Sequence, residues 1–526
     1  MPAQSEKNII RSKFSPTLKL DELSIADFYT GTLSSKGDGK PTVVGEQVQQ
    51  QLGIQYPFIA INDYTFNINE IKFFTLDCTG FLPKIKFTVQ FQNTDIFKVQ
   101  STPKDGDIVN LFIRAKNDTF KPIRNDYIIT NMDMGPGGVY NKGSYVTFEG
   151  ELFIPHARDQ ISKSYKGTSY NALQQLCSEL GLGFASNQDA NSSTIDEQVW
   201  ICPGDNYYEF MQDIVDHAWK DDTTFYTAFI DVYYHLNFID VNAQISMTGE
   251  EKIESSILDV VVQKGLSPDT VQNVTDSQTV TGKVLTNIEG FEGTNQYILN
   301  YAMKNESSDV ARRYGYKNFI RFYDMLSRQK WDITVDPIIT PGSSRDKIIL
   351  RGRPYPKLSG GNTGPYETYY ETQSNYVWAG VQSKNVHSNY IYAKYHNLRN
   401  LQELRKMYVE VNIPKWNPNV YLGEKLPLII YNGPEDNQKR NLQYAGKQQE
   451  DAKSTALEVS LDHFYSGHYM VYGFNITYAQ MSSSINTVSN QEKAEENRLP
   501  PNKTEPGFVQ SLILTRREWP TPVTSK

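Results

Sequence analysis

The chain has 526 residues, which is enough for several domains, and its formal net charge is −8. This charge argues against a general nucleic-acid binder, because such proteins carry a basic face. No stretch approaches the roughly 18 apolar residues that a membrane helix needs, so the sequence rules out a transmembrane protein. The 34 tyrosines stand out against 6 tryptophans. Tyrosine favours strands and has a polar tip, so the composition predicts a β-rich protein with moderately polar contact surfaces.

The cysteines and the N-terminus indicate the compartment. Cys78, Cys177 and Cys202 are odd in number, and no CxxC spacing occurs. The first residues lack the apolar segment of a signal peptide. We therefore expect reduced, mostly buried thiols and folding in a reducing cytoplasm.

Residues 1–55 are expected to form an N-terminal arm and a loop. Short segments that alternate apolar and polar side chains follow, with turn residues between them. This pattern predicts a first β-barrel domain over residues 56–162. Its expected strands are 71–74, 85–91, 108–113, 127–129 and 145–154.

The pattern changes near residue 165 and predicts a small α/β domain over residues 163–250. Thr168 or Ser169 can cap a helix that ends before Gly181. Leu173, Leu176 and Leu180 would share one face of that helix. Asp205 or Asn206 can cap a second helix, and the strands 224–230 and 233–239 would follow it.

We expect residues 251–304 and 405–526 to form a second, discontinuous β-barrel domain. Residues 305–404 are expected to form an insertion of uncertain fold. The expected strands of this barrel are 257–262, 279–285, 296–299, 409–413, the end of 417–430, 466–478 and 508–519. The predicted fold class is therefore α+β, mainly β: two antiparallel, tube-like β-barrels, a small α/β domain and an insertion. The two barrels could be a diverged duplication.

A search for catalytic or metal-binding patterns finds none that is specific. None of the seven histidines has tight ligand spacing, and His217 is expected to be structural. No GxSxG motif and no phosphate-binding loop occurs. The glycine-rich segments 135–138 and 359–361 are predicted to be turns.

Paired carboxylates and a tyrosine-rich stretch are two further candidates for a functional site. Asp221-Asp222 and Glu250-Glu251 are adjacent, so on a strand their side chains would diverge, and solvated surface is favoured. Residues 366–395 could stack sugar rings or form an interface, and the interface is favoured. We thus predict no enzyme, no catalytic or cofactor-binding residues, no metal ligands and no cofactor.

Two groups of segments together carry a resemblance. The first is the α/β region with Leu180-Gly181-Leu182-Gly183-Phe184 and the later segment Asn206-Tyr207-Tyr208-Glu209-Phe210. The second is C-terminal: Pro418-Asn419 with Gly423 before an apolar strand, then Ser466-Gly467-His468-Tyr469-Met470-Val471, and finally 514–519. In this order they resemble the central baseplate hub proteins of contractile-tailed bacteriophages and the hub part of type VI secretion spikes. Residues 305–405 depart from that pattern.

The resemblance implies a homotrimer in which two barrels per subunit build a pseudo-sixfold ring. Such a ring joins the tail tube to the central spike, contacts other baseplate proteins, and lets DNA pass without specific binding. It implies a structural virion protein in the tail baseplate, made in the host cytoplasm, without membrane insertion.

Two alternatives stay open at this point. The tyrosine-rich stretch 366–395 would suit a carbohydrate- or receptor-binding tail protein. A cytoplasmic multidomain enzyme is the second alternative, and it is less favoured because no catalytic constellation is found.

Overall fold

A computed structural model gives the fold. It describes residues 57–61, 64–66, 70–91, 103–113, 123–136, 144–190, 193–245, 285–287, 296–306, 317–324, 328–335, 367–374, 386–414, 416–417, 420–430, 462, 465–479 and 508–516. The predicted arm 1–55, the paired Glu250-Glu251, the glycine-rich 359–361 and the predicted strand 257–262 lie outside these residues.

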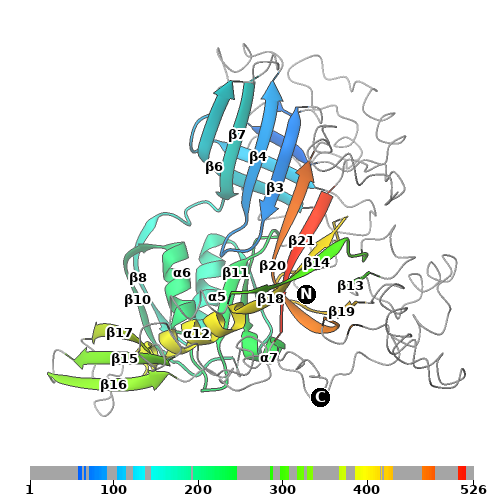
Figure 1. The fold of residues 1–526 in the computed structure, drawn as a ribbon. Coiled ribbons are helices and arrows are strands. Elements are labelled where there is room, and N and C mark those ends of the chain that lie inside the picture. Colours follow the sequence, from blue (N-terminus) through cyan, green and yellow to red (C-terminus); the bar gives the residue numbers. More distant parts are fainter. Residues whose placement is uncertain are drawn as a thin grey trace, which may run out of the picture.

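A single 13-stranded sheet dominates the described structure. Its main path runs β14-β18-β21-β20-β3-β4-β7-β6-β5-β1-β2, while β19 pairs with β20 and with β13 (Figure 1). Every pairing is antiparallel except β13 with β19. The strands are β1 (Phe58–Ile61), β2 (Tyr64–Thr65), β3 (Ile71–Asp77), β4 (Lys84–Phe91), β5 (Ile108–Ile113), β6 (Ile123–Pro136), β7 (Ser144–Leu152), β13 (Leu285–Thr286), β14 (Asn300–Asn305), β18 (Met407–Ile413), β19 (Lys425–Ile429), β20 (Gly467–Ala479) and β21 (Phe508–Thr515).

The strands of the two predicted barrel regions meet in this sheet. β20, from the C-terminal region, pairs directly with β3, from the N-terminal region, with Thr477 opposite Thr75. In Figure 1 the blue strands of the first region continue through β20 and β21 into β18 and β14. The mainly β class is confirmed. Within the described residues the sheet follows an open path, and no closed barrel is found.

In most strands the core lies on one face of the sheet, because side chains alternate between faces at every second residue, whereas β1 and β5 are buried on both faces. Strand β18 shows this alternation without a break, with Met407, Val409, Val411 and Ile413 fully buried. In the first region Phe87 on β4 stacks on Phe148 of β7, with ring centroids 5.0 Å apart.

The predicted α/β domain forms beside this sheet, and its helices begin and end where local signals place them. Helix α5 (Ser169–Leu180) has Thr168 as N-cap, and Gly181 ends it with φ of 71°. Helix α6 (Tyr207–Asp216) begins with a capping box between Asn206 and Glu209. The remaining elements are β8 (Gln160–Gly167), β9 (Gly183–Ser186), β10 (Gln198–Asn206), β11 (Tyr226–Ile230), β12 (His235–Asp240) and α7 (Val241–Ile245).

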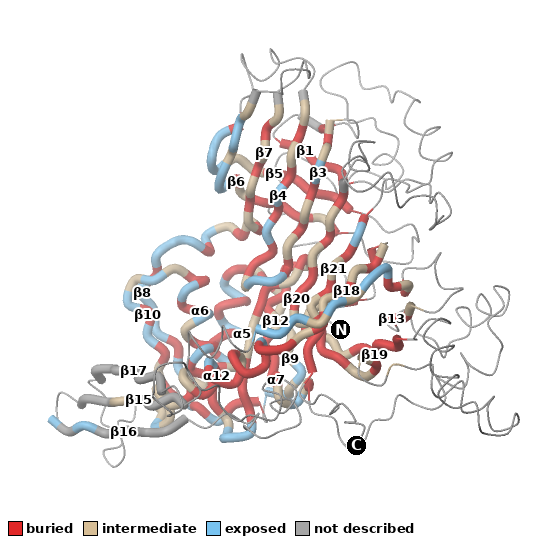
Figure 2. Tube along the Cα trace, in the orientation of Figure 1, coloured by how far each residue is buried: buried red, intermediate tan, exposed pale blue. Residues whose placement is uncertain are grey.

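Residues 305–404, predicted as an insertion, contain regular structure. Strands β15 (Lys317–Asp324), β16 (Gln329–Val335) and β17 (Glu367–Ser374) form a separate three-stranded sheet. The helix α12 (Tyr390–Arg405) follows and packs on α6. Its buried residues lie mainly in the C-terminal half of the helix, which Figure 2 shows in the colour of buried residues. The domain boundaries given above stay a prediction.

In the part of the chain that the structure describes, no helix has both the length and the apolar character to cross a membrane.

Candidate functional site

The C-terminal motif residues form one buried junction between β19, β20 and β21. The Arg516 guanidinium lies 4.8 Å from the centroid of the Tyr469 ring and donates to the Ser466 carbonyl at 3.2 Å. A Cβ on Gly467 would come within 2.7 Å of an Arg516 nitrogen. Ser466 also binds the backbone of Ile430, whose N–H donates to the serine hydroxyl at 3.0 Å. The described residues of this motif therefore hold strand ends together.

Gly423 has a similar role on the other side of this junction. Its φ is 76°, and a Cβ there would clash with the side chain of Ile239 from β12. Its N–H donates to the Val471 carbonyl at 2.8 Å. Only glycine allows the turn before β19 to lie this close to the α/β domain.

Gly183 of the first motif is likewise required by close packing against a neighbouring strand. Gly183 pairs with His235 across β9 and β12, and a Cβ would lie 2.5 Å from the histidine ring. Phe184, at the end of that motif, packs edge-on against Tyr170 with centroids 4.9 Å apart. The described residues of both motifs are thus explained by close packing.

The opposite face of the large sheet is mostly polar across both regions of the chain, and it also carries the exposed Phe73 and Val509. One row of paired residues crosses seven strands in register: Asn300, Asn412, Ser511, Asn475, Asp77, Lys84 and Glu151. A second row crosses six strands: Val509, Thr477, Thr75, Lys86, Glu149 and Asn131. Neighbours bond across the strands, as Thr88 and Thr147 do at 3.0 Å.

Two lysines on this face are paired with carboxylates of the same face, whereas the exposed Lys84 has no ion pair among the described residues. Lys86 Nζ lies 2.7 Å from Glu149 Oε1, and Lys304 Nζ lies 3.5 Å from Glu410 Oε2. The hydrogen bond from Lys86 lowers the pKa of Glu149. Arg158, after β7, donates to Glu151. The charges largely neutralise one another, so the face offers hydroxyls and amides more than free positive charge.

Helix α12 joins the α/β domain to the large sheet through buried polar side chains. Asn397 is 3% exposed, and its Nδ2 donates at 2.9 Å to the carbonyls of both Asp216 and Ala218, at the end of α6. Its Oδ1 accepts from the N–H of Tyr226 on β11 at 3.2 Å. At the other end of α12, the Thr515 hydroxyl of β21 donates to the Leu404 carbonyl at 3.3 Å.

Two further polar groups of α12 are buried with partners. His396 Nε2 donates to the Thr224 carbonyl at 3.0 Å, and burial lowers the pKa of His396. Glu403 lies between Arg399 and Lys406, and all three side chains are at most 5% exposed. The Glu403 carboxylate thus pairs with two cations, Arg399 on α12 and Lys406 directly after it.

The residues singled out from the sequence have structural positions where they are described. His217 is the C-cap of α6, donates through Nδ1 to the Asp213 carbonyl at 2.8 Å, and stacks on Tyr390 at 3.8 Å. These contacts are those of a packing residue. Asp221 accepts from the N–H and the hydroxyl of Thr223 in a turn. Gly135 and Pro136, predicted in a turn, end β6 instead, because they pair with Tyr145 and Ser144.

Part of the tyrosine-rich stretch packs inside the chain. Tyr390 stacks on His217, and Tyr392 meets Trp219 edge-on with centroids 5.4 Å apart.

Cys78, Cys177 and Cys202 are buried and free, and burial raises the pKa of Cys78 and Cys177. Among the described residues no group of three or more His, Cys, Asp or Glu side chains could hold a metal ion.

The sequence did not lead us to predict helix α12 or its buried polar side chains. The helix has little amphipathic character because asparagine, arginine and glutamate occupy its inner face. The available signal was the spacing of polar residues at i, i+3 and i+4, namely His396, Asn397, Arg399, Asn400, Glu403 and Lys406.

Comparisons with known proteins give structural neighbours only. No family model matches the chain, and no curated protein matches it. The tail protein from Neisseria meningitidis is 9% identical, with a TM-score of 0.43 over 88% of this chain and 96% of that chain. The 43 kDa tail protein of prophage MuSo2 from Shewanella oneidensis is 8% identical, with a TM-score of 0.43 over 88% and 98%.

A third neighbour comes from type VI secretion. It is an Escherichia coli component of that system, described as similar in structure to T4 bacteriophage tail proteins. It is 6% identical, with a TM-score of 0.38 over 88% of this chain and 79% of that chain. TM-scores below 0.5 do not establish a function, so the function below rests on the residues of this chain.

Proposed function

We propose that this protein is a structural component of a contractile tail, the baseplate hub. Three copies would form a pseudo-sixfold ring that joins the tail tube to the central spike and lets DNA pass. The observation that carries the proposal is the polar face that runs in register across both halves of the large sheet. The described residues of the two sequence motifs pack against neighbouring side chains, which fits a role without catalysis.

The character of the polar face supports passage of a polyanion. Duplex DNA binds proteins chiefly through unpaired lysine and arginine side chains that replace its counterions. In the two rows of this face Lys86 is held by Glu149 and Lys84 is unpaired, but the acidic Asp77, Glu149 and Glu151 outnumber these two lysines. Such a surface would let DNA slide without a binding site.

The open edges of the sheet support assembly. Residues 130–136 of β6 pair only with β7 among the described residues, and Met134 is 57% exposed. An exposed strand edge favours pairing with another chain, and ring closure removes such edges. The proposed partners are therefore further copies of this chain, the tube protein and the spike protein.

The experiment is a mass measurement of the purified full chain by light scattering, followed by low-resolution imaging. We expect the mass of three chains and a ring with a central hole. A stable monomer at high concentration that binds neither the tube nor the spike protein would overturn the proposal. A glycan array separates the carbohydrate-binding alternative, because the hub requires no signal there.

A further inference from the structure

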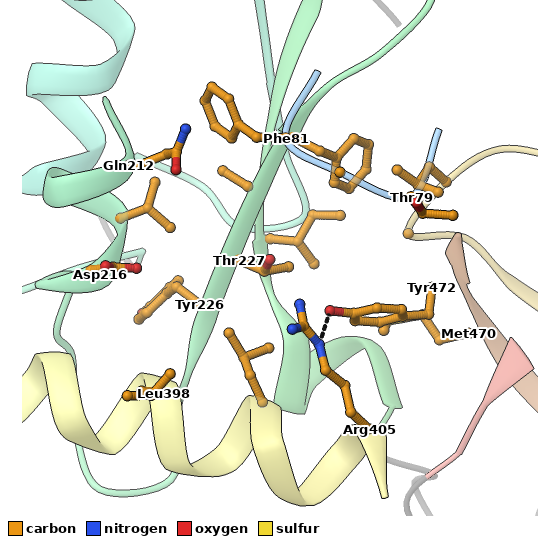
Figure 3. A pocket seen from close by; sticks show the side chains of 18 of the residues that line it. Thr79, Phe81, Gln212, Asp216, Tyr226, Thr227, Leu398, Arg405, Met470 and Tyr472 are labelled. Carbon is orange, nitrogen blue, oxygen red and sulfur yellow. Dashed lines mark hydrogen bonds between the residues drawn. The ribbon is translucent and has the colours of Figure 1, made fainter. Parts of the chain in front are cut away.

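Three parts of the molecule enclose a groove of about 450 Å³. Its walls are α6 and β11 of the α/β domain, α12, and β20 of the large sheet (Figure 3). The apolar part of the lining is incompletely covered, since Leu398 is 38% exposed and Phe81, Leu401 and Leu422 are half-buried. An apolar side chain bound in the groove would remove this surface from water, which is favourable.

Asp216 brings an exposed carboxylate to the end of the groove that contains Leu398. The two residues are close because Asn397, which precedes Leu398, donates to the Asp216 carbonyl at 2.9 Å. Figure 3 shows both at one end of the groove, with Arg405 and Tyr472 at the other. Among the described residues the Asp216 carboxylate accepts no hydrogen bond and lies in no salt bridge. It is therefore available to a cation from another molecule.

The local field at Asp216 favours such a cation. Asp216 is the last residue of α6, and the C-terminal end of a helix dipole is negative. Asp213 adds a second carboxylate one turn earlier, and the nearby Lys394 of α12 already pairs with Asp213 at 3.7 Å. Partial burial raises the pKa of Asp216, so a bound cation would stabilise its charged form.

The lining as a whole carries more negative than positive charge. Glu306 is its second carboxylate, and it accepts a hydrogen bond from the Tyr408 hydroxyl at 2.9 Å. Arg405 is the single cation among the described lining residues. Its Nε donates to the Tyr472 hydroxyl, and its guanidinium lies 5.0 Å from the centroid of that ring. The arginine is thus held at the end of the groove away from Asp216 and forms no pair with it.

We propose that this groove binds a short basic segment of a partner protein. An apolar side chain of that segment would contact Leu398, and a neighbouring lysine or arginine would pair with Asp216. Two carboxylates against one arginine favour a cation over an anion. The inference goes beyond the hub assignment and does not depend on it, because it rests on the groove alone.

A peptide fits the groove better than a small polyamine does. The lining residues near Asp216 include the apolar Val215, Leu398 and Leu401. A polyamine carries an ammonium group every few carbon atoms, and burying a second ammonium against these side chains would cost free energy. A peptide can place one cation beside one apolar side chain.

The test uses the full chain and short, capped, fluorescent peptides. Each carries one leucine and one lysine in a glycine–serine background, at spacings from adjacent to a few residues apart. Matched sets carry glutamine or glutamate in place of lysine, and fluorescence anisotropy measures the affinity. We expect one spacing to bind best, its glutamine partner to bind about tenfold more weakly, and its glutamate partner more weakly still.

Two variants assign the contacts. Asp216→Asn should weaken the lysine peptide about tenfold and abolish its advantage over the glutamine peptide. This variant should fold, because a carboxylate at a helix C-terminus is unfavourable. Leu398→Ser should weaken the lysine and glutamine peptides alike by severalfold, since it removes the apolar contact. The matched control is Glu197→Gln, an exposed carboxylate of the α/β domain outside the groove, which should bind like the wild type.

Three results would overturn the inference. They are the absence of any peptide binding tighter than about 1 mM, equal or tighter binding of the glutamate set, and wild-type affinity in Asp216→Asn. Binding of spermidine that Asp216→Asn abolishes, without peptide binding, would likewise reject a peptide in favour of a polyamine.

Discussion

Asn397 shows at the scale of one residue how this fold is held together. The last carbonyls of a helix have no partner within it. Asn397 donates to two carbonyls that end or follow α6, and it accepts from the backbone of β11. One buried amide therefore connects three elements that lie far apart in the sequence.

Asn397→Ala is predicted to destabilise the α/β domain by about 3 kcal/mol, because it leaves two carbonyls and one N–H buried without partners. Calorimetry of the full chain should show an unfolding transition several degrees lower. The control Asn171→Ala removes an exposed amide from α5 and should leave that transition within about one degree. Equal effects of the two changes would contradict the role of Asn397.

His396 predicts a pH dependence at the same scale. Burial lowers its pKa in the folded chain, so the unfolded chain binds more protons below its ordinary value of about 6.5. Stability from this group is therefore fully present above that pH and is lost as the pH falls toward the lowered value. His396→Gln should show a smaller loss of thermal stability between pH 7.5 and 5.5 than the wild type.

The control for this pH effect is His156→Gln, which removes a histidine with an 80% exposed side chain. This change should leave the pH dependence of the wild type in place. An unchanged slope in His396→Gln would show that the buried histidine does not control it.

At the scale of elements, the close approach of the turn before β19 to β12 joins the second sheet region to the α/β domain. Gly423 permits this approach because it has no Cβ and adopts a positive φ. Local capping acts at the same scale in α5 and α6, where Thr168, Asn206 and Gly181 set the helix limits.

Gly423→Ala is predicted to destabilise the chain by about 2–4 kcal/mol, from the clash with Ile239 and from the strained φ together. Thermal unfolding and soluble yield measure the effect. Gly135→Ala is the control, because a Cβ there meets nothing within 4 Å and its φ is not positive. Wild-type stability of Gly423→Ala would show that the turn can move away from β12.

At the scale of the whole molecule, the polar face is one surface built by strands from both ends of the chain. If it lines a passage for DNA, adding free cations to it should create affinity. Thr88→Lys with Thr477→Lys should raise the affinity of the assembled protein for duplex DNA about tenfold or more at low salt, with a steep salt dependence.

Ser162→Lys with Ser164→Lys is the matched control for this change. These serines are exposed on β8 in the α/β domain, so the net charge is the same but the location differs. Electrophoretic mobility of labelled DNA compares the two. Equal binding by both double variants would argue that the polar face does not line the passage.

The parts of the fold that depend on local chemistry could be predicted from the sequence. The helix α5 follows from Thr168, three leucines on one face and Gly181, all within a few turns of chain. Strands such as 108–113 follow from their composition and the turn before them. Strand β8 and the full length of β6 were missed, since exposed serines, lysines and asparagines carry no strand signal.

The candidate sites could be predicted only in part. The glycines at 183, 423 and 467 appear in the motifs, but the sequence does not reveal which atoms come close to them. Helix α12 was missed because its inner face is polar, and a polar face predicts solvent unless the partners are known.

The sequence by itself determined a large, acidic, mainly β protein with a two-helix α/β domain and no recognisable catalytic pattern. Periodicity and capping act over a few residues, so these features can be inferred without the fold. Only the tertiary structure decided that strands from both ends of the chain share one sheet and one polar face. It also decided that the polar inner face of α12 is buried, because pairing across hundreds of residues depends on contacts that no local pattern encodes.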